Sequence, residues 1–265
     1  MHSSFTSPSQ CSLTQWIWLP TLVFALLALP FVIGEFNQAS FLWLNSTSAL
    51  VPAPVWSAFT YLASTGAAFA VLTIALAWQP RWSAAALLAL PAGSIYTHGL
   101  KDLFSLSRPA GVLDESDFII IGESLSRNAL PSGHSVTALG VGAAVALCLV
   151  VQRRCGWAWL VLIIAGVAAF SRVAVGAHWP LDVLTGAFGG WLCGALGFWL
   201  SERWRFWQGN IGIRVMAVLL GTLAIWLFFE EAGDLPVDWP QQVLAVIAAL
   251  GAAVALYAGN RWSRA

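Results

Sequence analysis

The sequence predicts an all-α, polytopic bundle of transmembrane helices, and three observations lead to this fold class. Of the 265 residues, 59% are hydrophobic and only 9% are charged, a balance far from that of soluble domains. The apolar residues gather in runs of about 20, which is the length that a helix needs to cross the hydrocarbon core of a bilayer. Short segments rich in Pro, Gly, Trp and Arg separate these runs.

Eight apolar runs are candidate spans. They are Trp16–Ile33, Val55–Trp78, Trp82–Leu100, Ser132–Val151, Gly156–Val175, Val183–Leu200, Ile211–Phe229 and Val243–Ala258. We expect a six-helix core within residues 1–205 and two additional C-terminal helices within residues 206–265. The first run has no basic residues before it and no small-residue cleavage pattern after it, so we interpret it as a retained helix. Phe36–Leu50 carries Asn37 and Asn45, and we expect an interfacial helix or a loop there.

The distribution of basic residues predicts the orientation of the bundle, because Lys and Arg in short loops gather on the cytoplasmic side. With both termini cytoplasmic, eight arginines fall on cytoplasmic segments: Arg81, Arg153, Arg154, Arg203, Arg205, Arg214, Arg261 and Arg264. Four basic residues remain on the extracytoplasmic side: Lys101, Arg108, Arg127 and Arg172. Acidic residues show the opposite pattern, with Glu230, Glu231, Asp234 and Asp238 in an outer loop. Short loops favour a bacterial inner membrane as the location.

Charge and cysteine content exclude several kinds of partner and cofactor. The net charge is zero and no basic run occurs, so we expect no nucleic-acid partner. Four cysteines lack CxxC or His spacing, so we interpret them as small buried hydrophobic residues without a redox or metal role: Cys11, Cys148, Cys155 and Cys193. The sequence does not indicate an oligomeric state.

The outward basic residues lie in or beside three short motifs. The motifs are Lys101 with Arg108-Pro109, then Pro131-Ser132-Gly133-His134, then Ser171-Arg172 followed by His178 and Asp182. Cations and hydrogen-bond donors at fixed positions are what a site for phosphoryl transfer needs, because charge spreads over the phosphate oxygens. Ser132 and Gly133 open a predicted helix, whose free backbone amides favour an anion. His178 and Asp182, four residues apart, can meet across one helical turn, which Pro180 makes plausible.

In order and internal spacing the three motifs resemble the signature of the type 2 phosphatidic acid phosphatase superfamily. That superfamily includes membrane lipid phosphatases, glucose-6-phosphatase and vanadium haloperoxidases. The resemblance implies that His178 is the nucleophile that forms a phosphohistidine, that Asp182 orients it, and that His134 protonates the leaving oxygen. It implies a phosphate-binding set of five residues: Lys101, Arg108, Ser132, Gly133 and Arg172. The scheme requires no metal or other cofactor, and the motifs contain no cluster of carboxylate or His ligands.

The resemblance implies a lipid phosphatase acting within the bilayer, with several substrates open. The candidates are undecaprenyl diphosphate, phosphatidylglycerophosphate, phosphatidic acid and lipid A phosphate. Two alternatives stay open: a lipid phosphotransferase that passes the phosphate to another envelope lipid, and a non-catalytic lipid transporter. A haloperoxidase is disfavoured, because those of this superfamily resemble soluble proteins.

Three features near the motifs have no motif position. Arg127 belongs to no motif, and we interpret it as an anchor at the end of a helix. His98 lies one turn before Lys101 and either pairs with a neighbouring helix or supports Lys101. The long segment Asp102–Leu130 is either a solvated loop or one that dips into the interface and helps to select the lipid head group. Asn45-Ser46-Thr47 matches the glycosylation sequon, a match that is common by chance.

Overall fold

The computed structural model describes residues 12–229 and 239–258, and within them it contains ten α-helices and no strand. The helices are α1 (Leu13–Ala28), α2 (Gly34–Thr47), α3 (Ala53–Leu62), α4 (Thr65–Leu76), α5 (Pro80–Phe104), α6 (Gly133–Val151), α7 (Cys155–Ala174), α8 (Pro180–Trp204), α9 (Asn210–Phe229) and α10 (Trp239–Ala258). Short 3-10 turns lie at Leu29–Val32, Ser48–Leu50, Pro109–Gly111, Glu115–Asp117 and Phe206–Gln208. The predicted fold class is confirmed.

Among the described residues, six helices are long and apolar enough to cross a membrane: α1 with its 3-10 extension, α6, α7, α8, α9 and α10. The predicted span Val55–Trp78 is instead two helices, α3 and α4, bent by 69°, which would make a seventh span if counted as one. Ser64 caps α4 by accepting from the Ala67 N–H, so the chain starts a new helix there. The 25-residue α5 is long enough, but it is not among the six, because polar side chains fill its second half.

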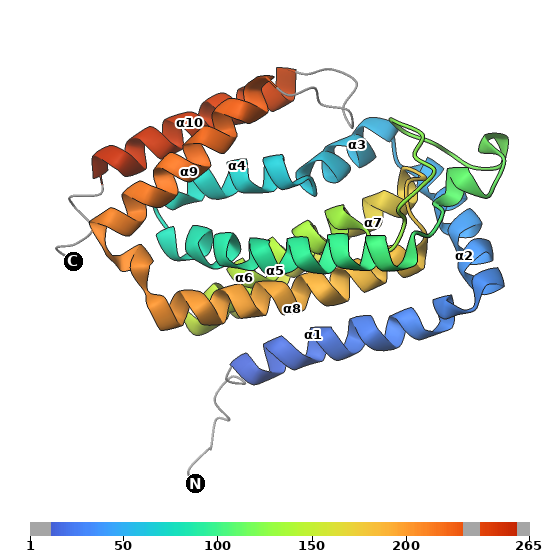
Figure 1. The fold of residues 1–265 in the computed structure, drawn as a ribbon, viewed down its shortest axis with the longest axis horizontal. Helices are drawn as coiled ribbons and strands as arrows, with labels where there is room; N and C mark the ends of the chain where they lie inside the picture. Colours follow the sequence, from blue (N-terminus) through green and yellow to red (C-terminus); the bar gives the residue numbers. More distant parts are fainter. Residues whose placement is uncertain (1–11, 230–238, 259–265) are drawn as a thin grey trace, which may run out of the picture.

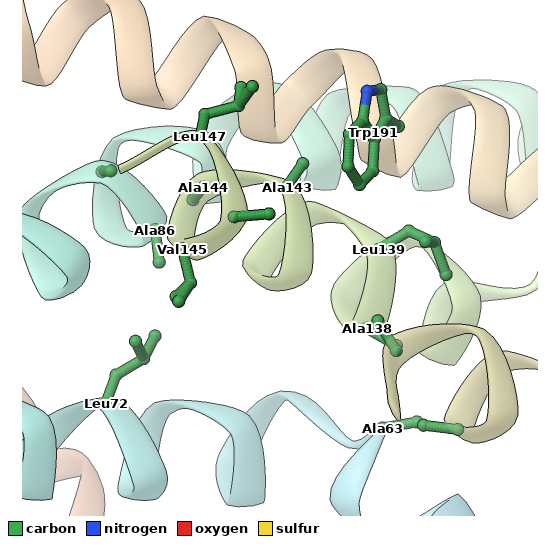
Figure 2. Packing of buried hydrophobic residues seen from close by; sticks show 14 of the residues in the cluster. Ala63, Leu72, Ala86, Ala138, Leu139, Ala143, Ala144, Val145, Leu147 and Trp191 are labelled. Carbon is green, nitrogen blue, oxygen red and sulfur yellow. The ribbon is translucent and has the colours of Figure 1, made fainter. Parts of the chain in front are cut away.

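Helix α6 is the centre of the bundle and packs against α5, α7 and α8 (Figure 1). Small side chains allow this close packing: Ala143 and Ala144 are fully buried, and Trp191 of α8 lies over this part of α6 (Figure 2). At Gly194 of α8 a Cβ atom would approach the Gly140 carbonyl oxygen to 2.2 Å, so only glycine fits this crossing. Packing of this kind stabilises helix pairs in lipid, where the hydrophobic effect between helices is weak.

The predicted C-terminal pair, α9 and α10, packs on itself and against α4, on the side of the bundle remote from α1 (Figure 1). The start of α1 and the end of α10 lie at one end of the bundle. The long loop between α5 and α6, helix α2 and the start of α8 lie at the opposite end (Figure 1). Arg81 belongs to the first end, where its guanidinium bonds the Glu202 carboxylate at 2.7 Å. The acidic segment 230–238 and Arg261 and Arg264 lie outside the described residues.

The cysteines follow the sequence interpretation in part. Cys148 is buried and Cys193 is half-buried, and both are free thiols. Cys155 is joined in a disulfide, which the interpretation as a simple buried hydrophobic residue did not anticipate. Cys11 lies outside the described residues.

Candidate active site

The turn between α7 and α8 brings Arg172, His178 and Asp182 together. Gly176 has a φ of +81°, a left-handed conformation that glycine adopts without strain, and the chain reverses there. The backbone N–H groups of Ala177 and His178 then donate to the Arg172 carbonyl at 3.0 and 3.1 Å. This folds His178 back against the last turn of α7. Arg172 and His178 are therefore held in one turn of the backbone.

His178 and Asp182 face each other across the first turn of α8, as the four-residue spacing predicted. His178 Nδ1 lies 3.3 Å from Asp182 Oδ2, and both side chains are buried. The same carboxylate oxygen accepts from the Trp179 N–H at 2.9 Å, so Asp182 also caps the helix that carries it. Pro180 occupies the first helical position. Asp182 therefore engages one imidazole nitrogen of His178 and leaves the other, Nε2, outside this contact.

The His178 imidazole is a neutral group in this environment. Its pKa lies well below 6.5, chiefly because burial disfavours the charged ring, and then because the charges of Arg108, Arg172, His134 and Lys101 repel a proton. The contact with Asp182 is accordingly a hydrogen bond between a neutral ring and the carboxyl group, not a pair of full charges. A neutral ring keeps a lone pair on one nitrogen, which a nucleophile requires.

The start of α6 supplies the second motif. Ser132 is the N-cap, and its hydroxyl accepts from the Ser135 N–H at 3.4 Å. Gly133 follows as the first helical residue, and Lys101 Nζ lies 4.0 Å from the position that a Gly133 Cβ would occupy. The first N–H groups of a helix lack partners within that helix and favour an anion. Lys101 and the amino terminus of α6 therefore present positive charge at one point.

Arg108 completes the cationic set from the loop after α5. Its Nε donates to the Arg127 carbonyl at 2.7 Å, and its backbone N–H donates to the Ser126 carbonyl at 3.0 Å. The side chain is buried, yet Nη1 has no hydrogen-bond partner among the described residues. Burial, followed by repulsion from Arg172, lowers the pKa of the Arg108 guanidinium to about 10. Arg108 therefore remains a cation at neutral pH, with a donor available for an anion.

Two cavities meet at His134. The smaller, of about 190 Å³, has walls from Arg172, Val175 and Ala177 on one side and from the loop residues Ile121, Glu123 and Leu125 on the other. The larger, of about 320 Å³, begins at Lys101, Gly133 and His134 and continues between α4, α5 and α6 along mostly apolar side chains. One histidine thus borders both a polar chamber beneath the loop and an apolar channel within the bundle.

All eight predicted site residues lie at this end of the bundle. Of the residues without a motif position, Arg127 contributes its carbonyl to Arg108, and His98 lies on the wall of the larger cavity. Thr60 of α3 was not predicted as a site residue: its hydroxyl accepts from Arg172 Nη1, and nothing local to Thr60 in the sequence indicates that contact. No group of three or more His, Cys, Asp or Glu side chains that could hold a metal occurs in the part of the chain that the structure describes.

Comparison with known proteins relates the sequence of this chain to a known family. Residues 80–206 match the family model of the PAP2 superfamily. The chain is 31% identical over 105 residues to the bacitracin transport permease protein BcrC of Bacillus licheniformis, across 40% of this chain and 48% of that protein. It is 44% identical over 64 residues to the undecaprenyl-diphosphatase of Sulfolobus acidocaldarius, across 23% and 29%. The chain thus matches less than half the length of these curated relatives.

Two solved structures share the fold. One is LpxE of Aquifex aeolicus, with a TM-score of 0.52 and 22% identity, covering 61% of this chain and 93% of that one. The other is a transmembrane PAP2-type phosphatidylglycerolphosphate phosphatase of Bacillus subtilis, with a TM-score of 0.54 and 22% identity, covering 71% and 97%. At this identity the likeness concerns the fold alone. The family match to residues 80–206 confirms the resemblance that the three motifs predicted.

Proposed function

The core of this chain, residues 80–206, belongs to the PAP2 superfamily, and we propose that the protein is an integral membrane phosphatase that hydrolyses a lipid phosphate through a phosphohistidine. The observation that carries the proposal is the buried pair of His178 and Asp182 among three cations. The unpartnered Nη1 of Arg108 supports it further, because a buried cationic donor is costly unless an anion completes it.

In the first step, Nε2 of neutral His178 attacks the phosphorus, and a P–N bond forms as the P–O bond to the lipid breaks. Asp182 accepts the Nδ1 hydrogen bond and stabilises the positive charge that develops on the ring. His134 protonates the lipid oxygen as it leaves. Lys101, Arg108 and Arg172, with the Ser132 side chain and the backbone amide of Gly133, stabilise the charge on the equatorial oxygens.

In the second step, His134 takes a proton from a water molecule, whose oxygen attacks the phosphohistidine. The P–N bond breaks, inorganic phosphate leaves, and His178 returns to its neutral state. Every charge and proton in this scheme comes from side chains of the chain, from water or from the substrate. The position of His134 between the two cavities supports its contact with both the leaving lipid and the incoming water.

A lipid substrate is favoured by the larger cavity, because it begins at the cationic site and continues between apolar side chains. The phosphate would sit at Lys101 and Gly133 with the chain of the lipid between the helices. The comparisons name relatives with different substrates, so undecaprenyl diphosphate, phosphatidylglycerophosphate, phosphatidic acid and lipid A phosphate all belong in the test panel.

The test is phosphate release from these four lipids by purified protein in the presence of a chelator, with and without His178→Ala. Arg203→Ala, an exposed change at the other end of α8, is the control. Release that survives chelation, depends on His178 and is unaffected by the control supports the proposal and identifies the substrate. Release that persists in His178→Ala would overturn the mechanism.

Transfer to a second lipid shares the first step, so the acceptor must be examined separately. With a labelled phosphate, hydrolysis gives labelled inorganic phosphate, whereas a phosphotransferase gives a labelled second lipid. One relative is named as a transport permease, so transport of the lipid is tested as well. Transport without hydrolysis predicts movement of the lipid across vesicles and no released phosphate, even with unaltered protein.

We also propose that the site lies on the extracytoplasmic face of a bacterial inner membrane, with both termini cytoplasmic. The arrangement in Figure 1 supports the shared side of the termini, because the described chain starts and finishes at the end remote from the site. The arginines at that remote end support its cytoplasmic location. In a cysteine-free background, a cysteine at Ser126 should react with a membrane-impermeant maleimide in intact cells, and one at Arg154 should not. The reverse pattern would contradict the orientation.

A further inference from the structure

Helix α2 carries an asparagine whose side chain bonds two segments next to the proposed phosphate site. Asn45 is fully buried in the last turn of α2. Its Nδ2 donates to the carbonyls of Ile119, Val173 and Ala174 at 3.0 to 3.1 Å, and its Oδ1 accepts from the Ile119 N–H at 2.7 Å. A side-chain amide offers two hydrogens, so three acceptors require that one hydrogen is shared. Both amide hydrogens of Asn45 and one lone pair of its oxygen are therefore engaged by segments far away in sequence.

The segments that Asn45 joins are the two walls of the smaller cavity. Val173 and Ala174 directly follow Arg172, and their carbonyls belong to the last turn of α7, where carbonyls lack partners within the helix. Ile119 belongs to the loop between α5 and α6. The loop and the end of α7 are also bonded directly, because the Ile121 N–H donates to the Val175 carbonyl at 3.1 Å. Arg172 and Val175 form one wall of the cavity, and Ile121 and Glu123 belong to the other.

A second asparagine of α2 reaches the other side of the catalytic turn. Asn37 Oδ1 accepts from the Leu181 N–H at 3.1 Å. Leu181 lies in the first turn of α8, directly before Asp182, where backbone N–H groups need partners from outside the helix. Helix α2 is thereby bonded both to the end of α7, after Arg172, and to the start of α8, after His178.

We propose that Asn45 is a positioning residue: it sets the separation between Arg172 and the wall formed by the 119–125 loop, and so the position of Arg172 toward the phosphate and the shape of the smaller cavity beside it. Asn45 does not touch the reacting atoms. It acts on Arg172 through the backbone segments on either side of the smaller cavity. A satisfied buried network of this kind rigidifies its surroundings. The inference rests on the proposed phosphatase activity and adds a requirement from outside residues 80–206.

Asn45 is also the first residue of the sequon Asn45-Ser46-Thr47. A glycan would be attached to Nδ2, which is buried and bonded to three carbonyls. The Asn45 amide is fully buried and is not accessible to a glycan in this fold.

The experiment uses Asn45→Asp, which keeps the shape of the side chain but replaces its donor with an acceptor that faces three carbonyls. Ser46→Ala is the matched control, because the exposed Ser46 hydroxyl bonds only the Trp43 carbonyl of its own helix. Three quantities are measured on purified full-length protein: kcat and KM on the active lipid, the dissociation constant of orthovanadate as a phosphate mimic, and the melting temperature.

We expect Asn45→Asp to lower kcat by about 100-fold, the scale of a displacement of about 1 Å at a reacting centre. The dissociation constant of orthovanadate should rise in parallel, and Ser46→Ala should change neither quantity. Where Asn45→Asp gives no folded protein, the smaller Asn45→Ser decides, with the same expectations.

A folded Asn45 variant with unchanged kcat and unchanged orthovanadate affinity would overturn the inference. A variant with a lower melting temperature but the same kcat per folded molecule would do so as well, because this is the behaviour of a residue with a structural role alone. Failure of the unaltered chain to release phosphate from any lipid would instead contradict the proposed function, and orthovanadate binding would then test the positioning role alone.

Discussion

The backbone N–H of Ser132 donates to the carbonyl of Asp182 at 3.0 Å, and this bond joins the amino ends of α6 and α8. It places Ser132, the N-cap of α6, against the residue whose carboxylate contacts His178. The approach is possible because Gly186, one turn further along α8, lies under the Ser132 carbonyl. A Cβ atom at Gly186 would be 2.7 Å from that oxygen and 2.9 Å from the Ser135 Cβ.

We therefore expect Gly186→Ala to separate the two helix ends and to lower both kcat and stability. Overpacking of this kind costs about 1–3 kcal/mol, and the displacement falls on the bond between the Ser132 N–H and the Asp182 carbonyl. Thermal melting and phosphate release measure the two effects. Gly166→Ala in α7 is the matched control, because a Cβ there meets nothing within 4 Å. Equal kcat in the two variants would contradict the link between this crossing and the site.

Asp182→Asn tests the orientation of the nucleophile while it preserves the shape of the side chain. The Asp182 oxygen that faces His178 also accepts from the Trp179 N–H. An amide oxygen that keeps the Trp179 bond stays opposite Nδ1 of His178 but carries no negative charge. The variant therefore stabilises less of the positive charge that develops on the ring during the attack. We expect kcat to fall by about 10²- to 10⁴-fold, with little change in melting temperature.

The decisive measurement for Asp182→Asn is trapping of labelled phosphohistidine on rapid acid-free quenching. Less labelled enzyme than in the unaltered chain is expected, since the first step is slowed. Full labelling with slow turnover would show that Asp182 acts in the second step instead.

The pH dependence of activity follows from the neutral state of His178. Because burial and the neighbouring cations hold the His178 pKa well below 6.5, the ring stays neutral, and able to attack, as the pH falls below about 6.5. Activity limited by His178 is lost only when the pH falls through its lowered pKa. The acid limb of kcat/KM in the unaltered chain should therefore lie well below that of an ordinary histidine.

Arg108→Gln should move this acid limb toward neutral pH. Removal of a nearby positive charge raises the pKa of His178, so the ring is protonated, and activity is lost, at a higher pH. The variant also loses phosphate affinity at every pH, so the shape of the profile is the informative quantity. Arg203→Gln, at the far end of α8, should leave the profile in place. An acid limb that does not move in Arg108→Gln would mean that His178 does not set it.

Features of the site encoded locally were predictable from the sequence. A four-residue spacing brings His178 to Asp182, a proline in the first turn starts α8, and a serine before Gly133 caps α6, because each depends on one turn of helix. The segment Phe36–Leu50 was expected to be either an interfacial helix or a loop, and most of it lies in helix α2. The break between α3 and α4 was not expected, because Ser64-Thr65-Gly66 is only a mild interruption of an apolar run.

Contacts that depend on which helices are neighbours could not be predicted. Arg172 and Thr60 are 112 residues apart, and Asn45 lies 128 residues from Val173. Composition marks Asn45 only as a polar residue in an apolar context, and its three carbonyl partners follow from the packing of α2 against the end of α7. The same holds for Glu123, which the sequence places only somewhere in a long loop.

Glu123 provides a test of whether this loop selects the head group. Its carboxylate borders the smaller cavity together with Arg172 and His134 and interacts with the charge of Arg108. The negative charge of Glu123 would repel a second phosphate in the smaller cavity, whereas a hydroxyl or amino group could donate a hydrogen bond to the carboxylate. We therefore expect Glu123→Gln to raise kcat/KM for a lipid diphosphate relative to a lipid monophosphate, by about threefold at low salt and less at high salt, as screening increases.

Asp117→Asn in the same loop is the control, because this exposed carboxylate does not border the cavity. The comparison requires both lipids under identical detergent and salt conditions, with the ratio of the two kcat/KM values as the readout. If Glu123→Gln and Asp117→Asn change that ratio equally, the loop acts through its general charge. If neither changes it, the loop is a solvated connection without contact with the substrate, and the head group must be selected by α5 and α6 alone.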